Sequence, residues 1–111
     1  MHKPPLESDW KVYSKRIAEW RDRYLARRNA EILAIFTDET RTPSEQFWDT
    51  KEEMDEEARI LHDSLGRFAR SQMRTNILVM YRRGMVDDAD LAEFSEELRA
   101  WVVEVTKGLD R

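Results

Sequence analysis

The sequence contains no cysteine. A disulfide framework, a thiolate metal site and a cysteine nucleophile are therefore excluded. The lack of cysteine fits a reducing compartment, and we expect the protein to be cytoplasmic. The first ten residues, MHKPPLESDW, lack the apolar core of a signal peptide. The longest apolar run, residues 77–81, is too short to span a membrane, so we expect a soluble protein with no membrane partner.

Glycine and proline are scarce, with three of each in 111 residues. The interior of the chain therefore carries few turn signals. Apolar residues make up 41% and charged residues 38%, which is enough apolar content for a core and too even a charge balance for a disordered chain. The length is close to that of one domain. We expect a single all-α domain over residues 9–107, a flexible N-terminus over 1–8 and a C-terminal tail over 108–111.

Apolar periodicity predicts a first helix over about residues 9–36, with Ser8 as its N-cap. Its first apolar positions follow the 3,4,3,4 spacing that is typical of a coiled-coil seam. The seam comprises Trp10, Tyr13, Ile17, Trp20 and Tyr24, followed after a shift by Leu25, Ile32, Ile35 and Phe36. An aromatic stripe at helical spacing is ordinarily core rather than a ligand cage. We therefore assign this face to the core.

A second helix is predicted to begin at Thr42-Pro43-Ser44-Glu45. In this segment threonine is an N-cap, proline fits the first helical position and glutamate closes a capping box. The next clear stop is Gly84, because glycine favours the residue just after a helix. The apolar seam of this helix consists of Phe47, Met54, Ala58, Leu61, Leu65 and Phe68, and it drifts past Gly66 to Ala69, Met73, Ile77 and Met80.

A third helix is predicted over about residues 88–107, beginning near Asp87 or Asp88. Its apolar seam consists of Leu91, Phe94, Leu98, Trp101, Val102 and Val105. The opposite face is acidic, which is typical of a solvent-exposed helix face. The chain is thus expected to contain three helices with short connections.

The length of the second helix decides between two architectures. An unbroken helix over residues 43–83 would span about 60 Å at 1.5 Å per residue, whereas a compact globule of this size is roughly 35 Å across. Either the helix breaks near Gly66 and the chain closes as a four-helix monomer, or it stays whole as a spine. We favour the spine, with three long antiparallel helices in a coiled-coil-like helical bundle that a homodimer completes. The dimer interface is then expected at the run that is apolar on every side, at Ile77, Leu78, Met80 and Tyr81.

Charge is distributed in blocks along the chain. Residues 37–57 carry −7, from nine acidic and two basic side chains, and residues 58–84 carry +5, from six basic and one acidic. Arg67, Arg70 and Arg74 line one face of the second helix. Such a stripe could contact the phosphates of a nucleic acid, or it could form the rim of a protein interface. The net charge of −4 favours the protein interface.

The acidic run KEEMDEE, residues 51–57, contains the pattern EExxEE. It resembles the first metal-binding motif of the all-helical MazG-type nucleotide pyrophosphohydrolases, and the resemblance implies a Mg²⁺-dependent hydrolase. That family also needs a second acidic pair on a facing helix. The candidates for the second pair are spaced differently: Glu93, Glu96 and Glu97. Within the run only Glu53 and Glu57 flank the predicted core. We therefore interpret the run as a solvated face with Lys51–Asp55 and Asp55–Arg59 pairs.

No residue is assigned a catalytic, cofactor-binding or metal-binding role. His62 is the one histidine expected to be ordered, and we interpret it as a residue at the boundary of the core. The sequence favours a non-enzymatic helical module for protein-protein interaction or regulation, homodimeric and acting on an unidentified protein partner. The alternatives are a nucleic-acid-associated protein that uses the arginine stripe and a metal-dependent nucleotide pyrophosphohydrolase.

Overall fold

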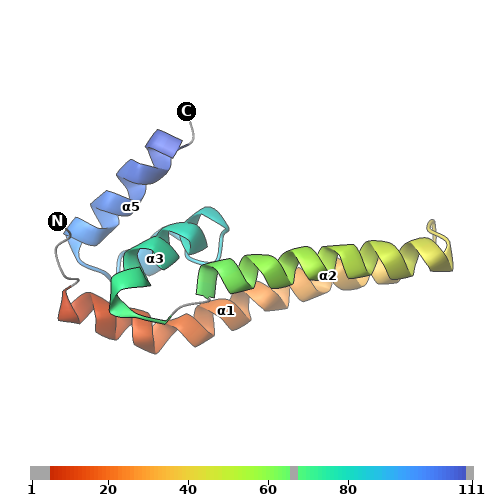
Figure 1. The fold of residues 1–111 in the computed structure, drawn as a ribbon, viewed down its shortest axis with the longest axis horizontal. Helices are drawn as coiled ribbons and strands as arrows, with labels where there is room; N and C mark the ends of the chain where they lie inside the picture. Colours follow the sequence, from red (N-terminus) through yellow and green to blue (C-terminus); the bar gives the residue numbers. More distant parts are fainter. Residues whose placement is uncertain (1–5, 66–67, 110–111) are drawn as a thin grey trace.

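The computed structural model describes residues 6–65 and 68–109 (Figure 1). These residues form helices and connecting segments, as predicted for an all-α chain. The helices are α1 (Glu7–Phe36), α2 (Pro43–Leu65), α3 (Met73–Arg82), α4 (Asp88–Leu91) and α5 (Glu96–Leu109), and a 3₁₀ turn, η1 (Arg70–Gln72), precedes α3. Within these residues, no helix is both long enough and apolar enough to cross a membrane.

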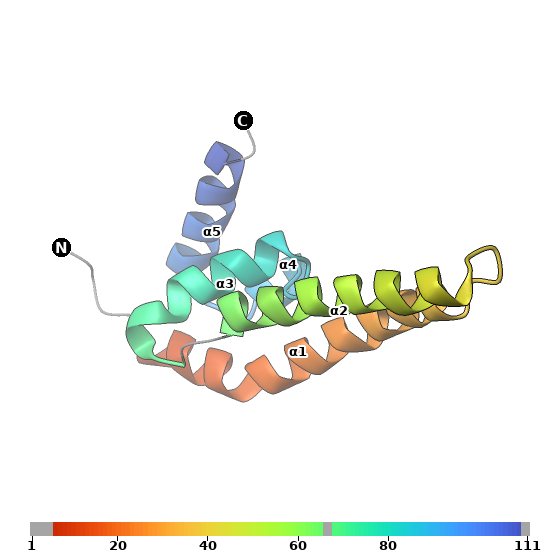
Figure 2. The same cartoon turned by 45° about the vertical axis from the view of Figure 1, so that its right-hand side comes forward.

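α1 and α2 form a long antiparallel hairpin whose far end extends beyond the rest of the chain (Figure 1, Figure 2). The molecule is correspondingly elongated, with extents of 53 × 32 × 25 Å. We call residues 25–63 the arm. The N-terminal half of α1 together with η1, α3, α4 and α5 forms the body. In the body, α3 lies between α1 and α5.

The hydrophobic core lies in the body. Its fully buried side chains are Tyr13, Trp20, Met73, Ile77, Met80, Met85, Val86, Leu91 and Val102. The Trp20 ring contacts that of Phe94 at 5.8 Å between centroids, and the side-chain amide of Asn76 donates to the Tyr13 hydroxyl at 3.1 Å. The aromatic face predicted for the first helix is therefore confirmed as core over its N-terminal part. Phe36, at the other end of α1, is half exposed.

The predicted spine over residues 43–83 is wrong. α2 ends at Leu65, and α3 runs back alongside the hairpin from Met73 (Figure 2). Gly66, the alternative break point, lies outside the described residues. Two residues further on, the Phe68 ring stacks on Tyr13 with 5.7 Å between ring centroids, and the backbone of Ala69 is extended. The reversal buries the apolar side of α3 in the chain's own core, which a continuous helix leading away from α1 could not do.

The predicted third helix is interrupted between α4 and α5. Asp9 of α1 is buried, and its carboxylate accepts hydrogen bonds from the N–H and the hydroxyl of Ser95, both at 2.7 Å. The Ser95 hydroxyl in turn accepts from the N–H of Leu98 at 3.2 Å, so Ser95 caps α5. A contact from a residue 86 positions away thus fixes where α5 begins. The apolar seam is confirmed, with Leu91, Phe94, Leu98 and Val102 all buried.

Local capping signals predicted the start of α2 and the end of α3 correctly, and the start of α1 incorrectly. The Thr42 hydroxyl accepts from the N–H of Glu45 at 3.1 Å while the Glu45 carboxylate accepts from the N–H of Thr42 at 2.9 Å, which confirms the capping box. Gly84 follows α3 with φ of +80°, a backbone conformation that favours glycine. Ser8 is not an N-cap, because α1 begins at Glu7. Glu7 and Ser8 therefore belong to α1, which begins two residues before the predicted start at residue 9.

Candidate interaction surface

The predicted dimer interface lies on α3 and is largely covered by the chain itself. Ile77 and Met80 have no exposed surface and belong to the core of the body. Leu78 and Tyr81 are partly buried and pack against the same core. The Tyr81 hydroxyl donates to the Asp88 carboxylate at 2.8 Å. The interface was predicted on the ground that a second copy would shield these side chains from water. The chain's own core already shields Ile77 and Met80.

The predicted arginine stripe makes contacts within the body. Arg67 lies outside the described residues. Arg70 pairs with Glu7 at 2.9 Å, and its guanidinium lies 4.9 Å from the centre of the Trp10 ring. Arg74 lies 4.4 Å from the centre of the Trp101 ring. These ion-pair and cation–π contacts fasten the start of α1 and the middle of α5 to the segment around η1. Binding of a nucleic acid or a protein by these arginines stays a prediction.

Arg28 of α1 occupies the space that the acidic run faces. Its guanidinium donates to Glu57 at 2.8 Å, to Glu53 at 2.6 Å and to Glu31 at 2.6 Å. The hydrogen bond with Glu57, followed by those with Glu53 and Glu31, raises the pKa of Arg28 above its ordinary value. Burial together with the carboxylate of Glu57 raises the pKa of nearby Tyr24 to about 12. Glu53 and Glu57, which were predicted to flank a core made by Met54 and Ala58, instead contact α1 through this arginine, and Met54 itself is exposed.

The rest of the acidic run faces water. Lys51 and Asp55 pair at 2.6 Å as predicted, but Arg59 pairs with Glu56 instead of with Asp55. His62 is exposed over 84% of its side chain, so its assignment to the core boundary is wrong. Over residues 6–65 and 68–109, no group of three or more His, Asp or Glu side chains is arranged to hold a metal ion. The segment that resembles the MazG motif therefore holds α1 and α2 together through Arg28.

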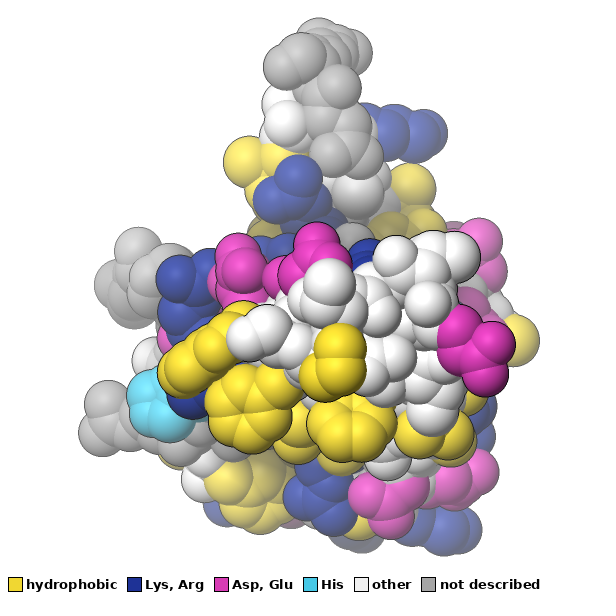
Figure 3. Space-filling model, turned by 90° about the vertical axis from the view of Figure 1, so that its right-hand side faces the viewer, with side chains coloured by type: hydrophobic (Ala, Val, Ile, Leu, Met, Phe, Trp, Pro, Cys, Tyr) yellow, Lys and Arg dark blue, Asp and Glu magenta, His cyan; other side chains and the backbone are white. Residues whose placement is uncertain are grey.

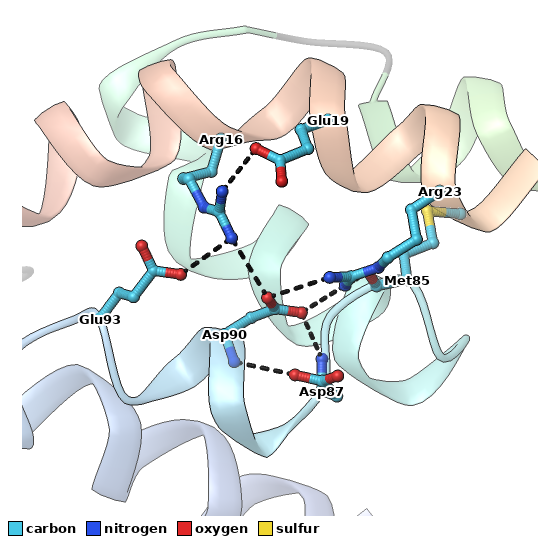
Figure 4. Close-up of polar contacts among 7 residues, drawn as sticks. All are labelled: Arg16, Glu19, Arg23, Met85, Asp87, Asp90 and Glu93. Carbon is cyan, nitrogen blue, oxygen red and sulfur yellow. Dashed lines mark hydrogen bonds and ion pairs between the residues drawn. The ribbon is translucent and has the colours of Figure 1, made fainter.

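A second ion-pair cluster joins α1 to α4 (Figure 4). Asp90 has a side chain only 5% exposed and accepts from the guanidinium of Arg23, while Arg16 lies 3.7 Å away. Arg23 also donates to the carbonyl oxygen of Met85 at 3.0 Å. Asp87 and Asp90 exchange hydrogen bonds in a capping box that starts α4. The cluster fixes the segment between α3 and α5 on α1.

We expect stability to fall in acid because of Asp90. Burial by itself raises the pKa of Asp90, but the hydrogen bonds from Arg23 and Asp87 outweigh it, and the pKa lies below its ordinary value. A carboxylate whose pKa is lower in the folded state stabilises that state above the unfolded pKa of about 3.9, and this stabilisation is lost as the pH falls through the folded pKa. Urea unfolding between pH 2 and pH 7 should show this loss.

Asp90→Asn should weaken the dependence of the free energy of unfolding on pH below pH 4. Asp63→Asn, on the exposed face of α2, is the matched control. An unchanged slope in Asp90→Asn would contradict the assignment.

Among the described residues, most of the exposed large apolar side chains lie on the arm. The described residues include eight large apolar side chains that are half exposed or more, and five of them are on the arm. They are Leu33, Phe36, Phe47, Trp48 and Met54, each 51–60% exposed. Seen from the end of the arm, hydrophobic side chains gather on one side of it (Figure 3). The Phe47 and Trp48 rings meet edge to face at 5.0 Å. We call these five residues the arm face.

Helical geometry explains why Leu33 and Met54 of the arm face lie on the same side of the arm. Leu33 directly follows Ile32, which is buried, and Met54 directly follows Glu53, which contacts α1. One residue further along a helix means a turn of about 100°. In two antiparallel helices, residues turned in the same sense away from the contact line lie on the same side of the pair. Leu33 of α1 and Met54 of α2 therefore lie on the same side of the helix pair and are exposed on one surface.

α2 turns Thr50 and Glu57 toward α1, so its orientation along the arm differs from the predicted one. Thr50 and Glu57 are buried, whereas Phe47 and Met54 of the predicted seam are exposed. The buried Thr50 hydroxyl has no hydrogen-bond partner in the described part of the chain, which is a destabilising arrangement. The seam for Phe47, Met54 and Ala58 was therefore assigned to the wrong surface. One sequence signal could have predicted this orientation. Arg28 is four residues from both Tyr24 and Ile32, so it shares their buried helix face and places a cation opposite Glu53 and Glu57.

Neither the sequence nor the fold leads to a relative of known activity. No protein-family model matches the chain, and we found no similar protein among curated proteins and no similar fold among solved structures. We therefore infer the function from the residues of the chain itself.

Proposed function

We propose that this protein is a non-enzymatic helical module for protein-protein interaction, with a regulatory or scaffolding role, and that it binds its partner through the arm face. The observation that carries the proposal is the orientation of α2. Its regular apolar stripe points to solvent at Phe47 and Met54, while its polar stripe with Thr50 and Glu57 packs on α1. An amphipathic helix turned in this way leaves its apolar side for another surface.

The size of the arm face supports a binding role. Aromatic side chains present about 150–250 Å² each, so five half-exposed large side chains leave on the order of 500 Å² of apolar surface in contact with water. The largest apolar patch on a typical monomer is about 300–600 Å² and is often functional. Aromatic residues and methionine are also the types that are enriched in interface cores. The arm face therefore has the extent and the composition of a binding site for a protein.

The two alternative functions gain less support from the structure. Arg70 and Arg74 of the basic stripe have partners within the body, at Glu7, Trp10 and Trp101. Glu53 and Glu57 of the acidic run hydrogen bond Arg28. No second acidic pair contacts them in residues 6–65 and 68–109. Arg70, Arg74, Glu53 and Glu57 are therefore already engaged in contacts within the chain, which makes these four side chains less available to phosphate or Mg²⁺.

A single introduced thiol tests the proposal, because the natural chain has no cysteine to compete for a label. We would replace Trp48 by cysteine, attach an environment-sensitive fluorophore and titrate the protein at submicromolar concentration with an amphipathic helical leucine–lysine peptide. We expect saturable blue-shifted emission, because the peptide's apolar side would cover the label. A scrambled peptide of the same composition should give no saturable change.

Two controls separate binding at the arm face from nonspecific adsorption. The label at Leu109→Cys starts from a similarly exposed apolar position on α5, and its emission should not respond. Adding Phe47→Ser to the Trp48→Cys chain should weaken the response at least tenfold, since buried aromatic anchors dominate helix recognition. Equal responses at positions 48 and 109, or no response to the amphipathic peptide, would contradict the proposal.

A further inference from the structure

We infer that the arm face binds a second copy of the same chain, so that two arms pack side to side into a four-helix bundle. The inference rests on the proposed function, because it names the occupant of the same surface. It also moves the homodimer contact from Ile77 and Met80, which are buried in the body, to the arm.

The shape of the arm favours another arm over a single helix. The two antiparallel helices of the arm carry exposed apolar residues on a common side, at Leu33 and Phe36 of α1 and at Phe47 and Met54 of α2. Such a hairpin is half of a four-helix bundle. A single partner helix covers only the groove between α1 and α2, whereas a second arm supplies two helices with the same length and spacing. A two-fold axis between the copies lets the same surface serve both.

The periodicity of α2 fits helix-to-helix packing. Phe47, Lys51, Met54, Ala58 and Leu61 follow the 4,3,4,3 spacing of a coiled-coil seam. Lys51 is the only charged residue in this stripe, and its ammonium pairs with Asp55 at 2.6 Å along the helix. The amino group can therefore stay at the edge of the seam while the methylene chain packs in it.

The uncovered apolar area is more than half of what each partner buries in a standard interface. A standard interface buries about 800 Å² on each partner. The five side chains of the arm face supply on the order of 500 Å² of this. The far end of the arm also projects clear of the body, so α3, α4 and α5 do not block a second arm (Figure 1).

The charge of the arm gives self-association a distinctive dependence on salt. Residues 25–63 contain eleven acidic and five basic side chains, a net charge of −6. Two arms therefore repel each other at long range, and added salt screens this repulsion. Self-association through the apolar face should tighten as salt rises. Binding of a basic partner helix to the same face would weaken instead.

Sedimentation equilibrium of the full chain tests the inference. At about 50 μM and 0.5 M NaCl we expect a mass close to twice the chain mass of 13.3 kDa, and lowering the salt to 0.05 M should raise the dissociation constant severalfold. The variant Phe47→Ser with Met54→Ser should stay folded, because both side chains are already exposed in one chain, and it should sediment as a monomer. The matched control Leu109→Ser removes an equally exposed apolar side chain from α5 and should stay dimeric.

Circular dichroism of each variant at low concentration verifies that the monomer is folded, so a loss of dimer reports on the interface. A natural chain that remains monomeric at 100 μM would overturn the inference, as would a dimer that the Phe47 and Met54 replacements leave intact. The natural chain could be monomeric while the labelled Trp48→Cys chain still binds the amphipathic peptide. In that case the proposed function stands, and the inference that a second copy occupies the arm face is wrong. If neither association occurs, both are wrong.

Discussion

Replacing Ile77 by aspartate is expected to unfold the protein. Ile77 has no exposed surface, and it lies in the core of the body with Tyr13 and Met80. The substitution removes a buried aliphatic side chain, which costs about 2–5 kcal/mol, and it adds an unpaired charge, which costs several kcal/mol more. Since domains of this size are stable by about 5–15 kcal/mol, we expect the far-ultraviolet circular dichroism of Ile77→Asp to lack a cooperative thermal transition.

The comparison with Leu33→Asp makes this test specific. Leu33 is 59% exposed on the arm, so an aspartate there stays hydrated within one chain and should leave the melting temperature of the monomer nearly unchanged. The same substitution should prevent self-association through the arm face. If Ile77→Asp remained a folded monomer while Leu33→Asp stayed dimeric, the core and the interface would both be misassigned.

Arg28→Met is expected to destabilise the protein by about 3–5 kcal/mol, because breaking a buried ion pair leaves the remaining charge without compensation. The side chains of Arg28 and Glu57 are 17% and 6% exposed, respectively. Glu53, which also loses its arginine contact, is more exposed and can be hydrated. Urea unfolding at pH 7, followed by circular dichroism, measures the change in the free energy of unfolding.

Two further variants determine whether the loss of stability in Arg28→Met comes from the unpaired Glu57 carboxylate. Arg28→Met combined with Glu57→Met should recover most of the stability, since well-packed apolar residues often replace a buried pair without cost. Lys51→Met breaks the solvent-exposed pair with Asp55 and should have little effect. A change below about 1 kcal/mol in Arg28→Met would contradict the buried pairing of α1 with α2.

The helices could be predicted where the signal is local. The capping box at Thr42 and the stop at Gly84 depend on residues within one turn of the helix end, and both are present. The aromatic seam of α1 could be predicted because Tyr13 and Trp20 recur at the spacing of one helix face. The interruption before α5 could not, because the buried carboxylate of Asp9 holds Ser95 from the opposite end of the chain.

The candidate site was predicted only in part. An apolar stripe with Phe47 and Met54 is visible in the sequence, but its periodicity shows only that these residues share a side of the helix. Periodicity does not say whether that side meets α1, a partner or water. The exposure of the stripe follows from the contacts of Arg28 with Glu53 and Glu57, which turn the polar side of α2 toward α1.

The sequence by itself determined the all-helical class, the aromatic core face of α1 and the capped start of α2, since each depends on interactions between residues a few positions apart. Only the tertiary structure decided that the chain turns back after α2, that Ile77 and Met80 are buried in the body, and that the arm face remains open. These outcomes depend on which surfaces meet. Which surfaces meet depends on the free energy of pairing charges such as Arg28 and Glu57 relative to that of burying apolar side chains from distant segments. Patterns within a few residues carry no information about these long-range contacts.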